Sequence, residues 1–273
     1  MVTVILTKQK HGTRFILWLC LLLFAAPIVA NDRQVNNEAF QRGEEFVFRA
    51  MYHSRLTGNV TAGDASLTIK PETVNVDGEP TMKIVGRANT RGVFNMFFVV
   101  ENEYVSYFHE EHLAPVRFHK NVREGRHRRN ADVRFQPDPG QVVSSDTIIE
   151  APPFVQDIIS AYYFARTFDM QGAQPGDAFE VKFYHSDEVY VSRIVFEGRE
   201  EITTSLGTFR TLRFKPEMLE GKVFSQPYPM TLWVSDDENK MPIRTESGLV
   251  VGRARLDLVQ FGGLKNMITS FVP

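Results

Sequence analysis

The stretch FEVKFYHSDEVYVSRIVF, residues 179–196, shows most plainly what kind of fold the chain adopts. Two runs rich in aromatic and β-branched residues, Phe179–His185 and Val189–Phe196, flank the polar pair Ser186-Asp187. Short alternating runs favour strands, and a two-residue polar link favours a tight turn. We therefore predict an antiparallel hairpin, with His185 close to its tip.

The same pattern recurs along most of the chain, where short alternating segments are separated by turn-forming residues. The further predicted strands are Glu45–His53, Ala65–Ile69, Met82–Asn89, Tyr104–Phe108, Glu200–Thr203, Thr208–Lys215, Met230–Val234, Ile243–Ser247 and Gly248–Phe261. Short turns join nearly all of them, and such connections favour antiparallel pairing. The sequence therefore predicts a mainly β fold.

One segment, residues 154–168, has helical instead of alternating spacing. Its apolar side chains at this spacing are Val155, Ile158, Ile159, Tyr162 and Tyr163. Pro152 and Pro153 precede it, and proline is tolerated at the start of a helix. We predict one amphipathic helix at about residues 154–168, packed on or into the sheet.

The N-terminus has the features of a secretory signal peptide. Lys8, Lys10 and Arg14 precede an apolar run that extends from Phe15 to Val29, and the small residue Ala30 follows it. A basic start, a short apolar core and a small residue at the cut are typical of a cleavable signal. The run is shorter than the ~20 residues of a membrane span. We predict cleavage near Ala30 and a periplasmic protein.

The alternative at this segment is an uncleaved N-terminal anchor, because Ile28 is bulkier than the residue usually found two positions before the last residue of a signal. Cleavage would remove Cys20, the single cysteine, so disulfides, thiolate metal sites and cysteine nucleophiles are excluded. It would also remove three basic residues and no acid, making the net charge of −2 more negative.

These properties limit the partners. A mildly acidic protein has no general affinity for nucleic acid. No later apolar run is long enough for a membrane span. We expect residues 31–273 to form a single β-rich domain.

A cationic hairpin is predicted within Val116–Phe135, with Glu124-Gly125 at its turn. In that register Arg117 lies opposite Asp132. The basic residues that gather at the tip are Lys120, Arg123, Arg126, Arg128 and Arg129. Two interpretations remain open. The tip binds a partner that carries phosphate or carboxylate groups, or it is a solvated hairpin whose charges prevent edge-to-edge pairing.

No catalytic or cofactor motif is present. His109 and His112 enclose two glutamates, but their spacing is one residue short of the zinc-binding helix motif, which needs histidines at i and i+4. Leu113-Ala114-Pro115 also prevents a long helix there. The nucleophile elbow, the P-loop and the dinucleotide fingerprint are all absent. We predict no metal, no cofactor and no identifiable catalytic residue.

Several motifs in a fixed order resemble one known family. They are Gly43-Glu44, Ala62-Gly63-Asp64-Ala65, Asp157–Tyr163, Leu206-Gly207-Thr208-Phe209, Leu232–Asp237, Met241-Pro242 and Gly252. Over Phe40 to Leu258 the chain resembles the DUF3108 family of exported bacterial proteins, a domain of unknown function. The resemblance implies a barrel-like or clam-like antiparallel sheet around the helix, in the cell envelope. It supplies no catalytic residues.

Two functions are consistent with these features. The first is a non-enzymatic binding or assembly factor for a lipid, a glycan or a protein of the envelope. The second is a hydrolase or lyase that acts on envelope polysaccharide with a carboxylate or histidine acid–base pair. An apolar cavity would favour a lipid carrier, whereas a polar cleft with convergent acid and base groups would favour the enzyme.

Overall fold

The computed structural model describes residues 33–55, 58–145, 147–218, 230–249 and 252–273. The predicted signal peptide, residues 1–30, lies outside the described residues. Residues 33–273 form one compact unit. Within the described part of this unit, no helix is long and apolar enough to cross a membrane.

A single antiparallel sheet of 15 strands dominates this unit, as the alternating sequence pattern predicts. The strands are β1 (Glu45–Ser54), β2 (Gly58–Val76), β3 (Glu79–Thr90), β4 (Val100–His109), β5 (Pro115–Glu124), β6 (His127–Gln136), β7 (Gln141–Val143), β8 (Ile148–Glu150), β9 (Ala178–His185), β10 (Glu188–Thr204), β11 (Gly207–Met218), β12 (Met230–Ser235), β13 (Pro242–Gly248), β14 (Arg253–Gly262) and β15 (Phe271–Val272). Two helices, α1 (Gly92–Phe97) and α2 (Ile158–Ala165), accompany them.

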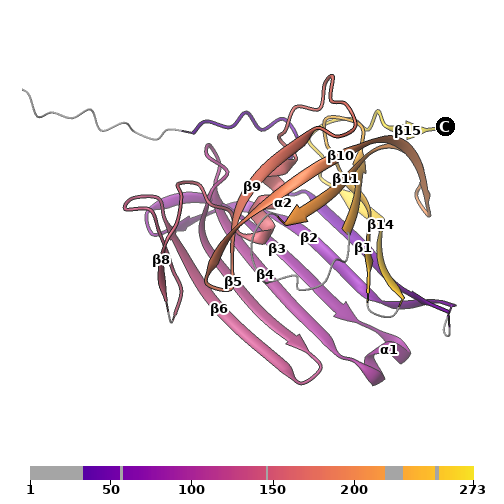
Figure 1. Ribbon diagram of the computed structural model, residues 1–273, viewed down its shortest axis with the longest axis horizontal. Coiled ribbons are helices and arrows are strands. Elements are labelled where there is room, and N and C mark those ends of the chain that lie inside the picture. Colours follow the sequence, from indigo (N-terminus) through magenta and orange to yellow (C-terminus); the bar gives the residue numbers. More distant parts are fainter. Residues whose placement is uncertain (1–32, 56–57, 146, 219–229, 250–251) are drawn as a thin grey trace, which may run out of the picture. The chain divides into compact units, whose positions relative to one another are not determined.

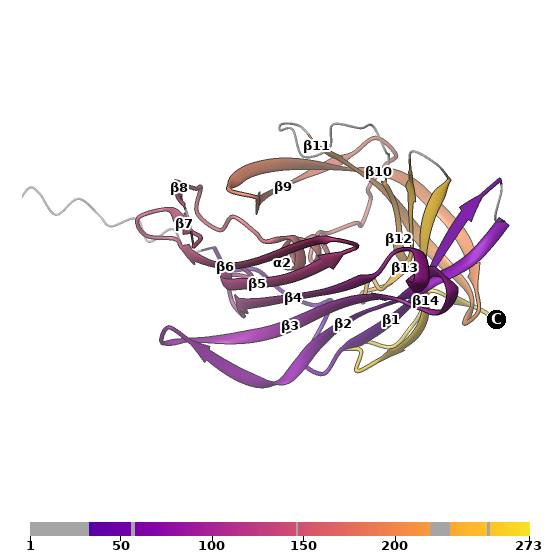
Figure 2. The ribbon, with the colours of Figure 1, turned by 90° about the horizontal axis from the view of Figure 1, so that it is seen from below.

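The strand order is β8-β7-β6-β5-β4-β3-β2-β1-β14-β13-β12-β11-β10-β9, and β15 pairs with β11 at the side. The sheet does not close, because its edge strands β8 and β9 do not pair. It curls strongly, and α2 lies between β4 on one side and β9 on the other (Figures 1 and 2). The predicted mainly β, clam-like fold is thereby confirmed.

The two edges of the curled sheet meet through side chains. Phe135 of β6, Val142 of β7 and Tyr184 of β9 belong to one buried apolar cluster, together with Val155. The rings of Phe135 and Tyr184 meet edge to face, with their centroids 6.0 Å apart. Packing therefore replaces the missing hydrogen-bonded ladder between the edges.

The hairpin of residues 179–196 forms as predicted, between β9 and β10. Ser186 and Asp187 have φ values of 50° and 65°, both left-handed. Two left-handed central residues define the turn whose twist matches that of paired strands. The predicted strands Val189–Phe196 and Glu200–Thr203 are two parts of β10, which has a register shift between Phe196 and Gly198.

The helix is present but shorter than predicted. Its cap is Asp157, whose side chain accepts hydrogen bonds from the backbone N–H groups of Ile159 and Ser160. Phe154 has a left-handed φ of 59° and Gln156 forms a bridge to β9, so a start at residue 154 is wrong. The apolar spacing extends past the cap because Val155 packs in the same core without being helical. The prediction of one helix also missed the short α1.

A buried ion pair fastens the end of α2 to the sheet. Arg166 donates to both carboxylate oxygens of Glu44, at 2.5 and 2.8 Å, from a side chain that is only 2% exposed. The same guanidinium donates to the carbonyls of Ala39 and Asn239. Arg166 thus connects α2, the segment before β1 and the β12–β13 turn.

Candidate functional site

The cationic hairpin forms from β5 and β6, but its register differs from the predicted one by two residues. Arg123 lies opposite Arg128, and Glu124 lies opposite His127. The turn therefore consists of Gly125 and Arg126. Gly125 has a φ of 59°, and glycine reaches this value without steric cost at the first central position of a hairpin turn. The predicted turn at Glu124-Gly125 is wrong, because it placed Gly125 at the second central position of the turn instead of the first.

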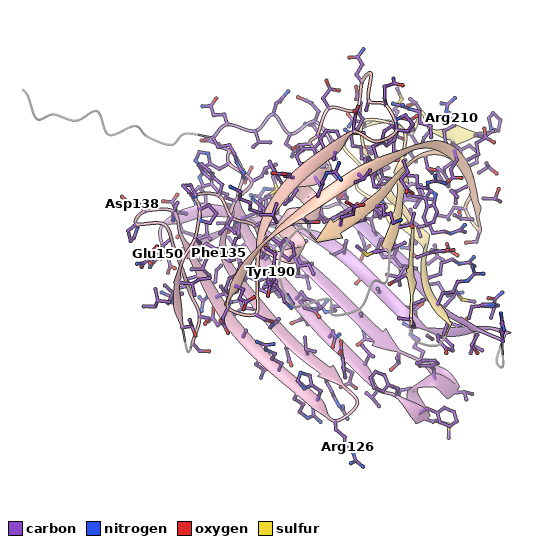
Figure 3. All side chains as sticks on the ribbon, in the orientation of Figure 1. Arg126, Phe135, Asp138, Glu150, Tyr190 and Arg210 are labelled. Atoms are coloured by element: carbon purple, nitrogen blue, oxygen red, sulfur yellow. The ribbon has the colours of Figure 1, made fainter. Side chains whose placement is uncertain are left out.

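The structure separates the five predicted cations into three groups. Successive residues of a strand point to opposite faces. The face of β4–β6 that contacts α2, here called the inner face, carries the buried residues Phe118 and Val133. Lys120 and Arg129 share this face. Arg126 points away from the sheet at the tip of the hairpin (Figure 3).

Arg123 and Arg128 lie on the opposite, outer face, directly across from each other. Arg123 donates to Glu101 of β4 at 2.6 Å, so its charge already has a partner. That ion pair offsets the repulsion expected between two cations placed opposite each other. The outer pair is therefore a poorer candidate for binding an anion than the inner pair.

The inner pair lies beside the β9–β10 turn. Arg129 donates to the hydroxyl of Ser186 at 3.1 Å. Burial lowers the pKa of Lys120, the charge of Arg129 lowers it further, and Asp187 opposes both effects. Burial likewise lowers the pKa of His185, and the charges of Lys120 and Arg129 add to that effect. Lys120, Arg129 and His185 thus form one electrostatic group, here called the inner cationic cluster.

Asp187 lies near this cluster, but its carboxylate is held by other groups. One of its oxygens accepts from the hydroxyls of Tyr184, at 2.7 Å, and Ser144, at 3.0 Å. The hydrogen bond from Tyr184 holds the pKa of Asp187 below its usual range. One carboxylate balances only one of the two basic side chains, Lys120 and Arg129. The cluster keeps a positive excess.

Sequence reasoning placed His185 at a hairpin tip but did not connect it with Lys120 and Arg129. The connection depends on the curl of the sheet, which brings β9 back over β5 and β6. No local sequence signal reports this approach. The hairpin pattern of residues 179–196 identifies the turn, but not what the turn faces.

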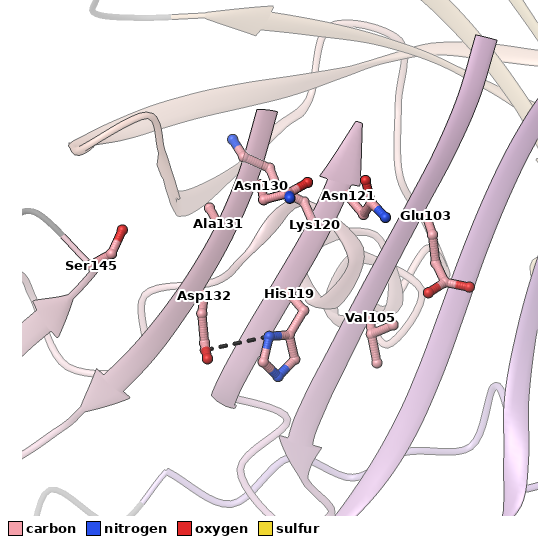
Figure 4. A pocket seen from close by; sticks show the side chains of 9 residues that line it. All are labelled: Glu103, Val105, His119, Lys120, Asn121, Asn130, Ala131, Asp132 and Ser145. Carbon is pink, nitrogen blue, oxygen red and sulfur yellow. Dashed lines mark ion pairs between the residues drawn. The ribbon is translucent and has the colours of Figure 1, made fainter. Parts of the chain in front are cut away.

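A second candidate is an open pocket of about 400 Å³ over β4–β6 (Figure 4). His119 Nδ1 lies 3.4 Å from Asp132 Oδ1. Asp132 also accepts two hydrogen bonds from Arg117, at 2.9 and 2.6 Å. Burial lowers the pKa of His119, whereas the bond from Arg117 lowers that of Asp132. The site therefore holds a charged carboxylate beside a histidine that favours its neutral form.

The predicted register hid this pair, because it placed Asp132 opposite Arg117 and not opposite His119. In the structure His119 and Asp132 are direct cross-strand neighbours. Glu103 and Asn121 also line the pocket. The geometry provides a base and its orienting carboxylate. Ser145 also lines the pocket, but no described hydrogen bond joins its hydroxyl to His119 or Asp132.

A larger depression of about 660 Å³ lies between the Asp169–Gln171 segment and the β12–β13 turn. Two carboxylates that line it, Asp236 and Asp237, already have partners. Asp236 pairs with Arg199 at 3.2 Å, and Asp237 accepts from the hydroxyls of Ser235 and Ser270, both at 2.7 Å. These bonds fix the turn, so the depression does not present a convergent acid–base pair.

Comparison with known families agrees with the fold and the motif order. The family model described as "Protein of unknown function (DUF3108)" matches residues 48–259. The chain belongs to the DUF3108 family. The resemblance inferred from the sequence motifs is thereby confirmed. The matched range includes β4–β6 and the β9–β10 turn, which together carry the inner cationic cluster and the pocket that holds His119.

Solved structures add information about the fold of this DUF3108 chain. A beta-barrel-like protein of the domain of unknown function DUF1849 from Brucella abortus has a TM-score of 0.55 at 10% identity, covering 82% of this chain and 99% of that one. At such low identity the similarity shows a shared fold alone.

Two other structures have TM-scores of 0.36. One is a candidate lipoprotein from Parabacteroides distasonis, with 13% identity, and the other a candidate exported protein with a YmcC-like fold from Bacteroides fragilis, with 11% identity. Each comparison covers 84% of this chain and 100% of the other. No curated protein matches the sequence.

Proposed function

We propose that this DUF3108 protein is an exported, non-enzymatic binding protein of the bacterial envelope. It holds a phosphate or carboxylate group of its ligand at the inner cationic cluster. The observation that carries the proposal is the convergence of Lys120, Arg129 and His185 from the two ends of the curled sheet. The predicted signal peptide supports the location.

The cluster suits an anion for two physical reasons. Partial burial reduces the solvation of Lys120, so a bound anion would restore favourable interactions that water supplies elsewhere. Arg129 donates from one nitrogen of its guanidinium group to Ser186, and the other N–H groups of the planar guanidinium can donate to a ligand oxygen. An anion would also favour the protonated form of His185.

The enzyme alternative rests on one observation, the His119–Asp132 pair in the open pocket over β4–β6. A neutral histidine oriented by a carboxylate is suited to general-base catalysis. However, Asp132 is more tightly bound to Arg117 than to His119, and the pocket is open to solvent. The contacts among Arg117, Asp132 and His119 join adjacent strands, and such ion pairs need no catalytic role. The binding function is therefore favoured.

A pair of double variants with equal charge changes tests the proposal. Lys120→Gln with Arg129→Gln removes the inner cluster. Arg126→Gln with Arg128→Gln removes the same charge from the tip and the outer face. The probe is inorganic phosphate, titrated at low ionic strength while the imidazole signals are followed by NMR.

We expect phosphate to shift the His185 signal in the parent protein and in the tip variant. In the cluster variant the affinity should fall at least about 10-fold, since hydrogen bonds to charged groups contribute ~1.5–3 kcal/mol each. Equal loss in both double variants would show that only the general charge matters. An unchanged affinity in the cluster variant would refute the site.

A further inference from the structure

We infer that the turn between β4 and β5 is a binding site for a divalent transition-metal ion, with Zn²⁺ the best match. The site consists of His109, Glu111 and His112. One ligand atom from each of these residues lies within 4.8 Å of the others. The sequence argument against a metal considered only the i and i+4 spacing of a long helix, and the turn brings the two histidines together in another way.

The backbone of this turn explains the arrangement. The N–H of Leu113 donates to the carbonyl of His109 at 2.9 Å, which closes one helical turn, and Leu113 has a left-handed φ of 47° that ends it. Residues at i and i+3 of a helical turn are neighbours on one face. The same i, i+3 spacing supplies paired metal ligands in helix-bundle carboxylate proteins. The imidazole rings of His109 and His112 accordingly lie 4.5 Å apart.

His112 already has the hydrogen bond expected of a metal ligand. Its Nδ1 lies 2.6 Å from the carbonyl oxygen of Arg33. A carbonyl only accepts, so Nδ1 carries the proton and Nε2 of the neutral ring keeps its lone pair. Metal-binding histidines usually donate their second N–H to a carbonyl or a carboxylate in this manner, which fixes the ring.

His109 requires a small rearrangement before it binds. Its Nδ1 accepts from the backbone N–H of Glu111 at 3.2 Å, and its Nε2 lies 3.8 Å from Glu79. For Nε2 to bind a cation, the ring must carry its proton on Nδ1 instead, so the long bond from the Glu111 N–H would be lost. Because the rings are nearly parallel, at 13° to each other, one must also turn to direct its lone pair at a shared ion.

The distances allow this adjustment. A tetrahedral zinc ion with ligand bonds of about 2.0–2.1 Å places its ligand atoms about 3.4 Å apart. The three groups therefore need to approach by little more than 1 Å, roughly the change produced by small side-chain rotations. Glu111 and Glu79 supply negative charge around the ion, whereas Glu110 is paired with Arg42 and stays outside the site. Two imidazoles with a carboxylate match the preference of zinc for nitrogen and oxygen ligands.

The experiment is a calorimetric titration of the untagged protein with Zn²⁺. We expect one ion per chain. His109→Gln with His112→Gln should weaken binding at least about 100-fold, and Glu111→Gln should weaken it less. The matched control, His53→Gln with His127→Gln, removes two histidines elsewhere and should bind as the parent does. Binding should also be weaker at about pH 5.5 than at about pH 7.5, because imidazole binds metal only when unprotonated.

X-ray absorption of the zinc-loaded protein provides a second measurement that is independent of variant folding. Two imidazole ligands per zinc would support the site. A zinc environment without imidazole, equal loss of binding in the control variant, or the absence of any binding heat in the parent would each overturn the inference.

Discussion

Replacing Arg166 by methionine is the most informative single test of how the fold is held together. Methionine keeps much of the side-chain volume and removes the charge. Five hydrogen bonds disappear, two to Glu44 and three to the carbonyls of Ala39 and Asn239. The Glu44 side chain is fully buried, so its carboxylate would be left without a cationic partner or water.

The expected loss follows from that uncompensated charge. Removing one member of a buried ion pair typically costs about 3–5 kcal/mol of unfolding free energy. Burial already raises the pKa of Glu44, while Arg166 opposes this effect. Without Arg166 the carboxyl group should become protonated. The carbonyls of Ala39 and Asn239 would remain unsatisfied, which adds to the loss.

Urea unfolding followed by tryptophan fluorescence measures this loss. Arg193→Met is the matched control, because Arg193 forms an ion pair with Glu217 in which both side chains are at least 40% exposed. Exposed pairs contribute about 0–1 kcal/mol. Adding Glu44→Gln to Arg166→Met should recover part of the stability, since the double variant no longer has to protonate a buried carboxyl group in order to fold. If Arg166→Met costs no more than Arg193→Met, the buried pair does not hold α2 to the sheet as argued.

Three further predictions test packing, protonation and export. Gly63→Ala should cost about 1–3 kcal/mol, because its Cβ would lie 2.0 Å from the carbonyl oxygen of Asn89, whereas Gly262→Ala has open space and should be neutral in the same urea assay. Burial raises the pKa of Asp157 from 3.8 to about 6, against the hydrogen bonds from its neighbours. The folded state therefore holds this proton more tightly, and the stabilisation present below about pH 4 should be lost as the pH rises through about 6. Relative to Asp157→Asn, the parent should lose about 3 kcal/mol between about pH 4 and 7 in urea unfolding, and parallel curves would contradict this. Mass spectrometry of protein from a bacterial periplasmic extract should find a chain that begins at Asn31, and retention of the first 30 residues would contradict cleavage.

The strands were predictable because their signals are local. Alternation along Glu45–His53 and the polar pair Ser186-Asp187 identify a strand and a turn without knowledge of the rest of the chain. The helix boundary was not predictable from spacing alone. Val155 has the apolar character and position of a helical core residue, but it is buried next to an extended bridge at Gln156. The true start depends on the cap formed by Asp157, which the apolar stripe does not reveal.

The candidate sites depend on contacts between distant parts of the chain. Lys120 and His185 are 65 positions apart, and only the curl of the sheet brings the charge of Lys120 close enough to lower the pKa of His185. The His109–His112 site was visible as a motif but was judged by helical spacing. Its geometry comes from a single turn closed by Leu113. The pattern rule therefore did not reveal that the two histidines are close, because an irregular backbone sets their distance.

The register error in the cationic hairpin changes the predicted partners of its side chains but not the faces on which they lie. Moving the pairing by two residues exchanges cross-strand partners but leaves every side chain on its own face, whereas a slip of one residue would reverse all of them. Lys120 and Arg129 therefore share a face in both registers, and Arg123 lies on the other face with Arg128. The partners did change, which is why His119 and Asp132 were not recognised as neighbours. Adjacent residues of β5, His119 and Lys120, consequently belong to opposite faces, although Lys120 also lines the pocket that holds His119. Arg129 and His185 do not line that pocket, so a variant of either one tests the binding hypothesis separately from the enzyme hypothesis.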